Sequence, residues 1–259
     1  MILILGGTYD GIYIGRYLKK SGYNVQISAK SKHGQKIIRD KGLEVYQNHL
    51  KASSGKMSQL LLKEKFSLVI DATHPFATEI TKGAIRACNE SDIPYLRYER
   101  PSLNISKGVN YERVNTFKEA ATQAKYYINN KNSKVFLTIG SKNLQSFTDI
   151  IDTKQIVARV LPLTSSITHC YNLGLLPENI IALQGIVRYS LNKSLFKNYN
   201  ASVLVTKDSG LESGLQEKLH ASKDLGMKVI LINRPNYEEV MTFSNYDDLF
   251  EWIKNNQDN

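Results

Sequence analysis

Short, uninterrupted apolar runs alternate with longer amphipathic stretches along most of the chain, and this order constrains the fold more than any other feature. The runs lack the polar–apolar alternation of a half-exposed strand, and are typical of parallel strands buried on both faces. The predicted strands are Ile2–Leu5, Asn24–Ser28, Leu68–Asp71, Tyr95–Arg97, Lys134–Thr138, Gln155–Arg159, Ser202–Thr206 and Lys228–Ile232, and the predicted helices include Gly11–Lys20, Ala77–Asn89, Phe117–Ile128 and Leu211–Leu225. This alternation indicates an α/β fold with parallel sheets and right-handed crossovers.

Two segments in different halves of the chain follow the same order. Leu68–Pro101 and Val203–Pro235 each run from a strand through a polar loop and a helix to a second strand that ends in Arg-Pro. The stretches after them, Tyr111–Phe117 and Tyr237–Phe243, are identical at five of seven positions, and a helical stretch follows each. The sequence therefore predicts two similar α/β halves.

These echoes suggest domain boundaries. We expect a first α/β domain over residues 1–101 that binds a cofactor, and a second over residues 102–235 on the substrate side. Pro101 would break the strand before it, at the point where the chain crosses between domains. We expect residues 236–259, with the helix Tyr246–Lys254, to pack back on the first domain.

The chain carries a net charge of +10, with 34 basic and 24 acidic residues among 259. The basic residues are scattered and no block of five like charges occurs, so we expect no nucleic-acid-binding tail. An excess of this size favours an anionic small molecule as partner, or serves only solubility.

Other function classes are disfavoured by what the sequence lacks. No apolar run approaches the roughly 20 residues that span a bilayer, so we expect no membrane segment. Met1–Leu5 has no basic region before it and is typical of a first strand rather than a signal peptide. Cys88 and Cys170 have no Cys or His at metal-ligand spacing, which predicts no metal site. Two unpaired thiols suit a reducing compartment, and we expect a cytoplasmic protein.

The turn after the first strand, Gly6-Gly7-Thr8-Tyr9-Asp10-Gly11, is the first candidate site. Glycines allow a phosphate to approach the backbone, and the helix N-terminus that follows supplies free N–H groups. We expect Thr8 to bind a phosphate through its hydroxyl, and Gly7 to adopt a positive φ. The spacing is not the full G-x-G-x-x-G pattern, and a ligand-free turn is the alternative.

The second strand leads into Ser28-Ala29-Lys30-Ser31-Lys32. Folds that prefer NAD usually place an acid here for the ribose hydroxyls, and none of these five residues is acidic. Ser28, Lys30 and Ser31, together with Lys32, suit the 2′-phosphate of NADPH. The alternative is a solvated basic loop.

A third candidate site follows Leu68–Asp71, where open α/β sheets bind ligands. Thr73 can bond a ribose or a substrate, and His74 offers a donor, an acceptor or a cation near neutral pH. A structural histidine is the alternative.

Polar and basic residues recur at the strand ends of the second half, where the substrate is expected. Arginine binds carboxylates through paired hydrogen bonds, and ordinary loop chemistry is the alternative. The predicted substrate-binding residues are Arg100, Gly140, Ser141, Arg159, Gln184, Lys207 and Ser209.

Taken together, these motifs resemble the precorrin-6A reductase family over nearly the whole chain. The most specific are Asp-Ala-Thr-His-Pro-Phe-Ala at 71–77 and Thr-Lys-Asp-Ser-Gly at 206–210. Weaker matches are Gly-Gly-Thr at 6–8, Arg-Tyr-Glu-Arg-Pro at 97–101, Ala-Arg-Val-Leu-Pro at 158–162 and Gln-Gly at 184–185.

The resemblance implies two Rossmann-like domains with a cleft between them. It also implies hydride transfer from NADPH to a conjugated double bond of precorrin-6A or cobalt-precorrin-6A in cobalamin biosynthesis, with Asp10 near the cofactor. His74 and Asp208 are candidates for the proton donor or a polar positioner, and water is the alternative. The carboxylates of such an acidic tetrapyrrole would give the positive charge a function.

Two other interpretations stay open at this point. A short-chain-type dehydrogenase or epimerase needs a Tyr-x-x-x-Lys pair, which Tyr127 and Lys131 provide, but no serine lies in the strand end just upstream. A regulator that binds NADP without turnover is the other.

Overall fold

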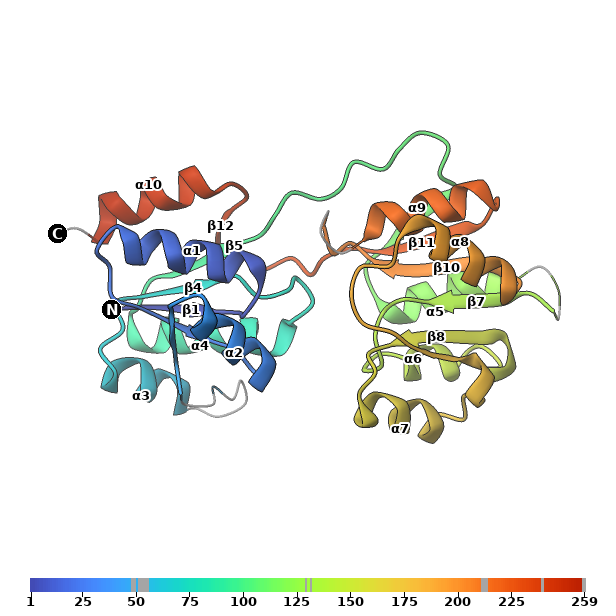
Figure 1. The fold of residues 1–259 in the computed structure, drawn as a ribbon, viewed down its shortest axis with the longest axis horizontal. Helices are drawn as coiled ribbons and strands as arrows, with labels where there is room; N and C mark the ends of the chain where they lie inside the picture. The colour runs from blue at the N-terminus through green and yellow to red at the C-terminus, as the bar shows by residue number, and fades with distance from the viewer. Residues whose placement is uncertain are drawn as a thin grey trace. The chain divides into compact units, whose positions relative to one another are not determined.

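The computed structural model describes residues 1–47, 50, 56–128, 130, 132–210, 214–238 and 240–257. The chain forms two compact units, and Figure 1 labels the strands and helices of each. The first unit comprises Met1–Pro101 and Pro235–Asn259, and the second comprises Ser102–Arg234.

The first unit is a parallel sheet with the strand order β12-β5-β4-β1-β2-β3. Its strands are β1 (Ile2–Leu5), β2 (Val25–Ser28), β3 (Glu44–Val45), β4 (Leu68–Asp71), β5 (Tyr95–Tyr98) and β12 (Met241–Phe243). Its helices are α1 (Tyr9–Lys20), α2 (Lys32–Asp40), α3 (Lys56–Lys63), α4 (Thr78–Ser91) and α10 (Tyr246–Gln257).

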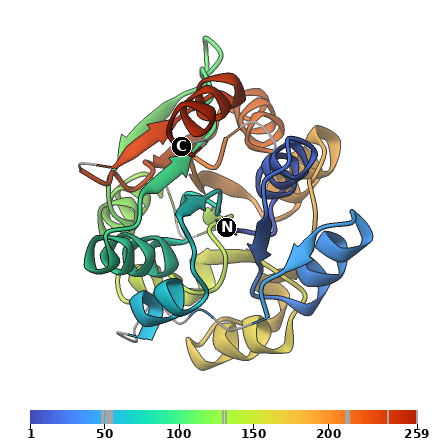
Figure 2. The same ribbon diagram turned by 90° about the vertical axis from the view of Figure 1, so that its left-hand side faces the viewer.

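Successive residues of β1 point to opposite faces of this sheet, and both faces are covered. Ile2 and Ile4 pack with the apolar sides of α1, α2 and α10. Leu3 and Leu5 pack with α3 and α4. Figures 1 and 2 show these two helix layers around the sheet. Burial on both faces explains why β1 is an uninterrupted apolar run.

The second unit is also a parallel sheet, with the order β6-β11-β10-β7-β8-β9. Its strands are β6 (Tyr111–Val114), β7 (Lys134–Leu137), β8 (Ile156–Val160), β9 (Ile180–Ala182), β10 (Ala201–Lys207) and β11 (Lys228–Ile232). Its helices are α5 (Phe117–Tyr126), α6 (Gln145–Thr148), α7 (Thr164–Asn172), α8 (Tyr189–Asn198) and α9 (Leu215–Asp224). Residues of α8 and α9 join Val157 and Leu204 in one core cluster.

Each sheet takes its last strand from the other half of the chain. After β5 the chain leaves the first unit, and β6 pairs in parallel with β11 of the second. After β11 it returns, and β12 pairs with β5. The first sheet thus has the order 3-2-1-4-5-6 of a doubly wound nucleotide-binding fold. The second sheet has the same arrangement, except that β6, which fills the sixth place, precedes the other five strands in the chain. These arrangements confirm the prediction of two Rossmann-like halves.

The sequence echo at the two crossings does not align equivalent positions. Phe117 begins α5, whereas its counterpart in the echo, Phe243, ends β12. The equivalent caps are Thr116, which accepts a hydrogen bond from the backbone N–H of Glu119, and Asn245, which accepts one from that of Asp248. Residues that are equivalent in the structure are thus offset from those that the sequence repeat aligns. Strands β6 and β12 nevertheless occupy the same place in their sheets.

Candidate functional site

Three of the predicted loops of the first unit lie along one edge of its sheet. Strand β1 pairs with β2 on one side and with β4 on the other, all in parallel, so Leu5 lies between Ser28 and Asp71. The loops that follow these three residues therefore begin side by side at the carboxyl edge, where doubly wound sheets bind ligands.

The turn after β1 requires glycine at two positions for steric reasons. Gly6 has a φ of 111°, and a Cβ atom there would lie 2.9 Å from the backbone oxygen of Ala72. A Cβ atom on Gly11 would lie 2.1 Å from the backbone oxygen of Gly6. Gly7 has no positive φ, so the prediction for it was wrong. Glycine fits at position 7 because a Cβ atom there would lie only 2.9 Å from the Cβ atom of Ala29.

Thr8 holds this turn in place with both functions of its hydroxyl group. The oxygen accepts a 3.0 Å hydrogen bond from the backbone N–H of Gly11, which caps α1, and the hydroxyl donates a 2.7 Å hydrogen bond to the backbone oxygen of Ala72. Since its one proton is directed to Ala72, the hydroxyl is not a phosphate donor in this geometry. Any phosphate contact of Thr8 would come from its backbone N–H.

Asp10 connects the first turn of α1 to two distant elements. Its Oδ1 atom lies 2.6 Å from Arg100 and accepts a 2.6 Å hydrogen bond from the hydroxyl of Tyr246 in α10. This ion pair also places Arg100, which we predicted to bind substrate, at the carboxyl end of β5 in the first unit.

The loop after β2 presents the predicted basic side chains to solvent. Ser31 caps α2 by accepting a 3.0 Å hydrogen bond from the backbone N–H of Gly34, and Ser28 accepts one from Gly6 through its backbone oxygen. Lys30 and Lys32 are both exposed. A positive loop therefore lies beside the glycine turn.

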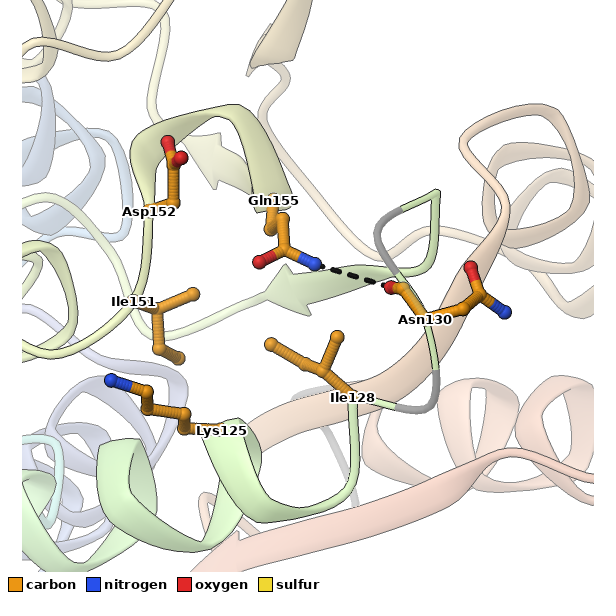
Figure 3. A pocket seen from close by; sticks show the side chains of 6 residues that line it. All are labelled: Lys125, Ile128, Asn130, Ile151, Asp152 and Gln155. Carbon is orange, nitrogen blue, oxygen red and sulfur yellow. Dashed lines mark hydrogen bonds between the residues drawn. The ribbon is translucent and has the colours of Figure 1, made fainter.

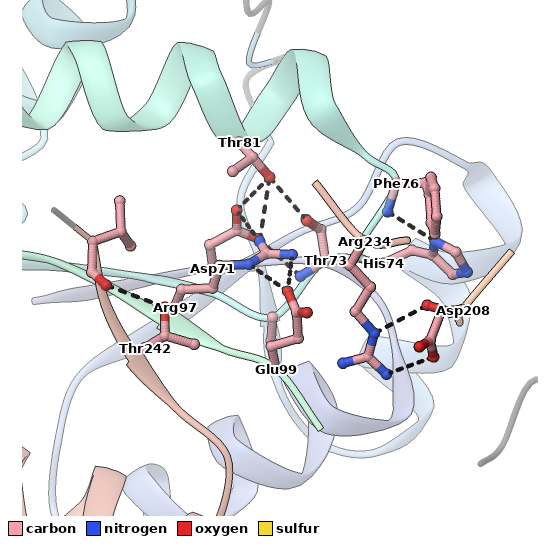
Figure 4. A network of polar contacts seen from close by, with 12 residues as sticks. Asp71, Thr73, His74, Phe76, Thr81, Arg97, Glu99, Asp208, Arg234 and Thr242 are labelled. Atoms are coloured by element: carbon pink, nitrogen blue, oxygen red, sulfur yellow. Dashed lines mark hydrogen bonds and ion pairs between the residues drawn. The ribbon is translucent and has the colours of Figure 1, made fainter. Parts of the chain in front are cut away.

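The loop after β4 is shaped by the buried carboxylate of Asp71 (Figure 4). One oxygen accepts a 2.8 Å hydrogen bond from the backbone N–H of Thr73. The other accepts hydrogen bonds from Thr81 and Tyr95, each 2.7 Å long, and from Arg97 at 3.1 Å. With all these donors, Asp71 organises the loop and is not available as an acid.

Arg97 completes this network on the buried side of the sheet. Its guanidinium group lies 2.8 Å from the carboxylate of Glu99 and 5.3 Å from the ring centre of Tyr237, which precedes β12. Burial alone would lower the pKa of Arg97, but the carboxylates of Asp71 and Glu99 outweigh it and raise that pKa. The network thus ties the His74 loop to the returning segment of the chain.

His74 is exposed and has a defined orientation. Its Nδ1 atom accepts a 3.2 Å hydrogen bond from the backbone N–H of Phe76 (Figure 4). In the neutral ring the proton is then on Nε2, so this nitrogen is the donor. Thr73, at the start of the same loop, has its hydroxyl 3.5 Å from the hydroxyl of Thr81 in α4.

Asp208 in the second unit is surrounded by guanidinium groups. Its carboxylate lies 2.9 Å from Arg113 and 3.6 Å from Arg234, and its backbone oxygen accepts a 3.0 Å hydrogen bond from Arg234 (Figure 4). An anion in this setting accepts hydrogen bonds and anchors the loop after β10.

The remaining predicted residues of the second unit lie along the carboxyl edge of its sheet. Gly140 and Gly185 have positive φ angles and open space where a side chain would stand. The hydroxyl of Ser141 lies 3.4 Å from that of Ser166, and Ser209 donates to the backbone oxygen of Lys207. Of the predicted substrate set, Gly140, Ser141, Arg159, Gln184, Lys207 and Ser209 thus share one sheet edge, and Arg100 does not.

A buried lysine at this edge was not predicted from the sequence. Lys218 in α9 is buried and donates a 3.1 Å hydrogen bond to the hydroxyl of Thr206. Burial, with the nearby charges of Arg159 and Lys207, lowers the pKa of Lys218 to about 7. The available signal was its place between Leu215 and Leu219 on the apolar side of a helix, where a lysine is out of pattern.

A pocket of ≈ 310 Å³ lies at the opposite edge of the second sheet (Figure 3). Its lining residues come from the end of α5, the segment after it and the segment before β8, namely Lys125, Ile128, Asn130, Ile151, Asp152 and Gln155. The amino ends of parallel strands are not where this fold binds its ligands.

Within the described part of the chain, no helix is long and apolar enough to cross a membrane. The same residues contain no group of three or more His, Cys, Asp or Glu side chains that could hold a metal ion.

Two parallel sheets with a glycine turn after the first strand define a two-unit α/β protein of the nucleotide-binding type. A sequence profile described as "Precorrin-6x reductase CbiJ/CobK" matches residues 1–254. The chain belongs to the precorrin-6x reductase family, and it is therefore an oxidoreductase that acts on a CH–CH group. This assignment decides against the short-chain dehydrogenase and the non-catalytic regulator.

Similar proteins cover the whole chain. Cobalt-precorrin-6A reductases from Priestia megaterium and Methanocaldococcus jannaschii are each 34% identical to it, and each alignment covers 98% of both proteins. A solved structure of CobK precorrin-6A reductase has a TM-score of 0.75 and 23% identity, and the match covers 98% of this chain and 96% of that one. The likeness in structure supports the fold assignment.

Proposed function

We propose that this protein reduces a conjugated double bond of precorrin-6A, with or without cobalt, using NADPH. The relatives named for this activity match the chain from end to end, which is the observation that carries the proposal. A nicotinamide cofactor is implied by the reductase family itself. The choice of NADPH over NADH rests on Lys30 and Lys32, which are exposed beside the glycine turn where the adenosine end of a dinucleotide is expected.

The residues of the first unit fit a dinucleotide. Helix α1 begins directly after the turn formed by Gly6 and capped by Thr8, and the N-terminus of a helix is where a pyrophosphate binds in this fold. Ser31 and the neighbouring lysines supply hydroxyl and ammonium donors one strand away. When bound, the dihydronicotinamide supplies the hydride.

The chain then has to orient the substrate and deliver one proton. The carboxylates of the tetrapyrrole meet Arg159 and Lys207 at the carboxyl edge of the second sheet. His74 presents an Nε2–H group held by the Phe76 contact, and we assign it the role of proton donor or of a donor that orients the reacting ring. Asp208 positions the loop that carries Lys207 and Ser209.

The direct test is consumption of NADPH. Purified protein is mixed anaerobically with NADPH and either metal-free or cobalt-containing precorrin-6A, and the loss of dihydronicotinamide absorbance is followed. We expect turnover with at least one form and lower kcat/KM with NADH. No turnover with either form, from folded protein that binds NADPH, would contradict the proposal.

A further inference from the structure

Two cationic side chains lie on the same face of the second sheet. Val157 and Leu204 belong to the core cluster formed with α8 and α9. Side chains alternate along a strand, so Arg159 in β8 and Thr206 in β10, each two positions further on, face the same helices. Lys218 extends from α9 to the hydroxyl of Thr206, and burial, together with the charge of Arg159, lowers the pKa of Lys218.

The hydrogen-bond partners of these two basic side chains are uncharged. Arg159 donates a 2.9 Å hydrogen bond to the side-chain oxygen of Asn192, whose amide in turn donates to the backbone oxygen of Val187. Lys218 donates to a hydroxyl group. Among the residues that the structure describes, no carboxylate pairs with either of them. Buried cations are costly without an anion, so this pair is set up to receive one.

Burial lowers the pKa of each basic group in this cluster, and repulsion between neighbouring charges adds to it for Lys207 and Lys218. Burial lowers the pKa of Arg159 to about 10, and burial together with Lys142 lowers that of Lys207 to about 8. The charges that act on Lys218 are those of Arg159 from β8 and Lys207 from β10, while Lys142 from the loop after β7 acts on Lys207. Helix α8 contributes the neutral Asn192. An arriving anion offsets this repulsion and favours the charged form of lysine.

The surroundings of the cations indicate which anion this is. Leu161 and Leu163, just beyond β8, are 49% and 52% exposed, and Ile186, beyond β9, is 62% exposed. Ile186 lies against Gly214, one residue before α9. A ligand with an apolar ring and carboxylate arms matches a sheet edge that carries both exposed apolar side chains and basic ones. The phosphates of a dinucleotide are the other source of an oxyanion, but their site is expected in the first unit.

We propose that Arg159 and Lys218 bind one carboxylate of the tetrapyrrole, and that Lys218 takes up a proton as this carboxylate binds. Arg159, the more accessible of the two, makes the direct contact, and Lys218 supports it from the buried side. The carboxylate remains ionised, and the proton comes from solvent. This inference rests on the proposed function and adds to it a residue and a coupled protonation.

Calorimetric titration tests the proton uptake. Precorrin-6A is titrated into the cofactor-free protein at pH 8 in two buffers of different ionisation enthalpy, and the difference in heat gives the protons taken up. We expect close to one proton per bound tetrapyrrole, and affinity that falls by up to about tenfold per pH unit between pH 7 and 9. The variant Lys218→Met, which keeps the volume and removes the charge, should lose at least half of the uptake and flatten the pH dependence.

Controls separate this inference from the proposed function. Lys223→Met, an exposed lysine of the same helix, should behave as the unmodified protein. Tetrapyrrole binding with equal uptake in Lys218→Met, or with none in the unmodified protein, overturns the inference alone. Uptake on titration with 2′,5′-ADP instead assigns the cations to a phosphate and also overturns it. Absence of any tetrapyrrole binding by folded protein overturns both proposals.

Discussion

The hydroxyl group of Thr8 donates a 2.7 Å hydrogen bond to the backbone oxygen of Ala72, 64 residues further along the chain. The bond joins the glycine turn after β1 to the loop after β4 that carries His74. The sequence predicts these two loops as separate candidate sites, but the hydrogen bond couples their positions. A substitution that displaces one loop should therefore also disturb the other.

Thr8→Ala should cost about 2 kcal/mol of stability, because it removes a helix cap worth about 1 kcal/mol and a hydrogen bond of similar size. Thr8→Ser keeps the hydroxyl and should lose much less. Chemical denaturation of the three proteins measures this. Equal stability of the alanine and serine variants would show that the hydroxyl does not hold the turn.

The two adjacent glycines should respond differently to substitution. Gly6→Ala combines a positive φ with a 2.9 Å clash against backbone, so we expect a loss of stability of roughly 1–3 kcal/mol and weakened NADPH binding. Gly7→Val has an allowed φ and meets the side chain of Ala29, so it should fold but bind NADPH at least tenfold more weakly. Normal NADPH affinity in folded Gly7→Val would place the cofactor elsewhere.

Cofactor preference should depend on the loop after β2. Lys30→Asp places a carboxylate where the 2′-phosphate is expected, and should reverse the preference from NADPH to NADH in kcat/KM. Lys36→Asp makes the same charge change on the exposed side of α2 and should leave the preference unaltered. Equal efficiency of the unmodified protein with both cofactors would refute the role of Lys30.

His74→Asn tests the proton donor with the loop preserved. The asparagine oxygen can accept the backbone N–H of Phe76 as Nδ1 does, so the turn should remain while the Nε2–H group is lost. We expect normal folding and NADPH binding, and a loss of at least roughly tenfold in the single-turnover rate. An unchanged rate with a lower melting temperature would make His74 a structural residue.

The sequence predicted the strands that are buried on both faces of a sheet and missed those that are not. All eight predicted strands were found with boundaries within one residue, because a strand buried on both faces is an apolar run. The missed strands β3, β6, β9 and β12 are the four sheet edges. Tyr111–Val114 has only Val114 buried, and such an edge strand has no apolar run to recognise.

The boundaries of the predicted helices also lie close to the observed ones. The observed α1, α4 and α5 begin and end within two residues of the prediction. The helix predicted from Leu211 is observed from Leu215, and residues 211–213 lie outside the described part of the chain.

The strand exchange could not be read from the sequence, because local patterns do not say which sheet an edge strand joins. The structural roles of individual side chains could not be predicted from the sequence either. The sequence marks Thr8 and Asp10 as ligand contacts, but their partners Ala72 and Tyr246 come from distant positions and are known only in the fold.

Lys218 should make stability depend on pH. Its pKa in the folded protein, about 7, lies below that of an unfolded lysine, so protonation favours the unfolded chain. The free energy of unfolding should fall as the pH drops from about 10 to 7 and then level off. In Lys218→Met this contribution should vanish, which makes the variant more stable by up to a few kcal/mol at pH 7. Denaturation curves at pH 7 and 9.5 check it, and a variant that is less stable at both would contradict the buried neutral lysine.

Transfer of deuterium from the cofactor tests the central claim most directly. NADPH that carries deuterium at C4 in the R or the S position is supplied anaerobically with precorrin-6A or its cobalt form. The mass of the tetrapyrrole product is then measured by mass spectrometry. We predict that one of the two labelled cofactors delivers one deuterium to the reduced ring, and that the other delivers none. A reduced product without deuterium from either cofactor would contradict direct hydride transfer by this protein.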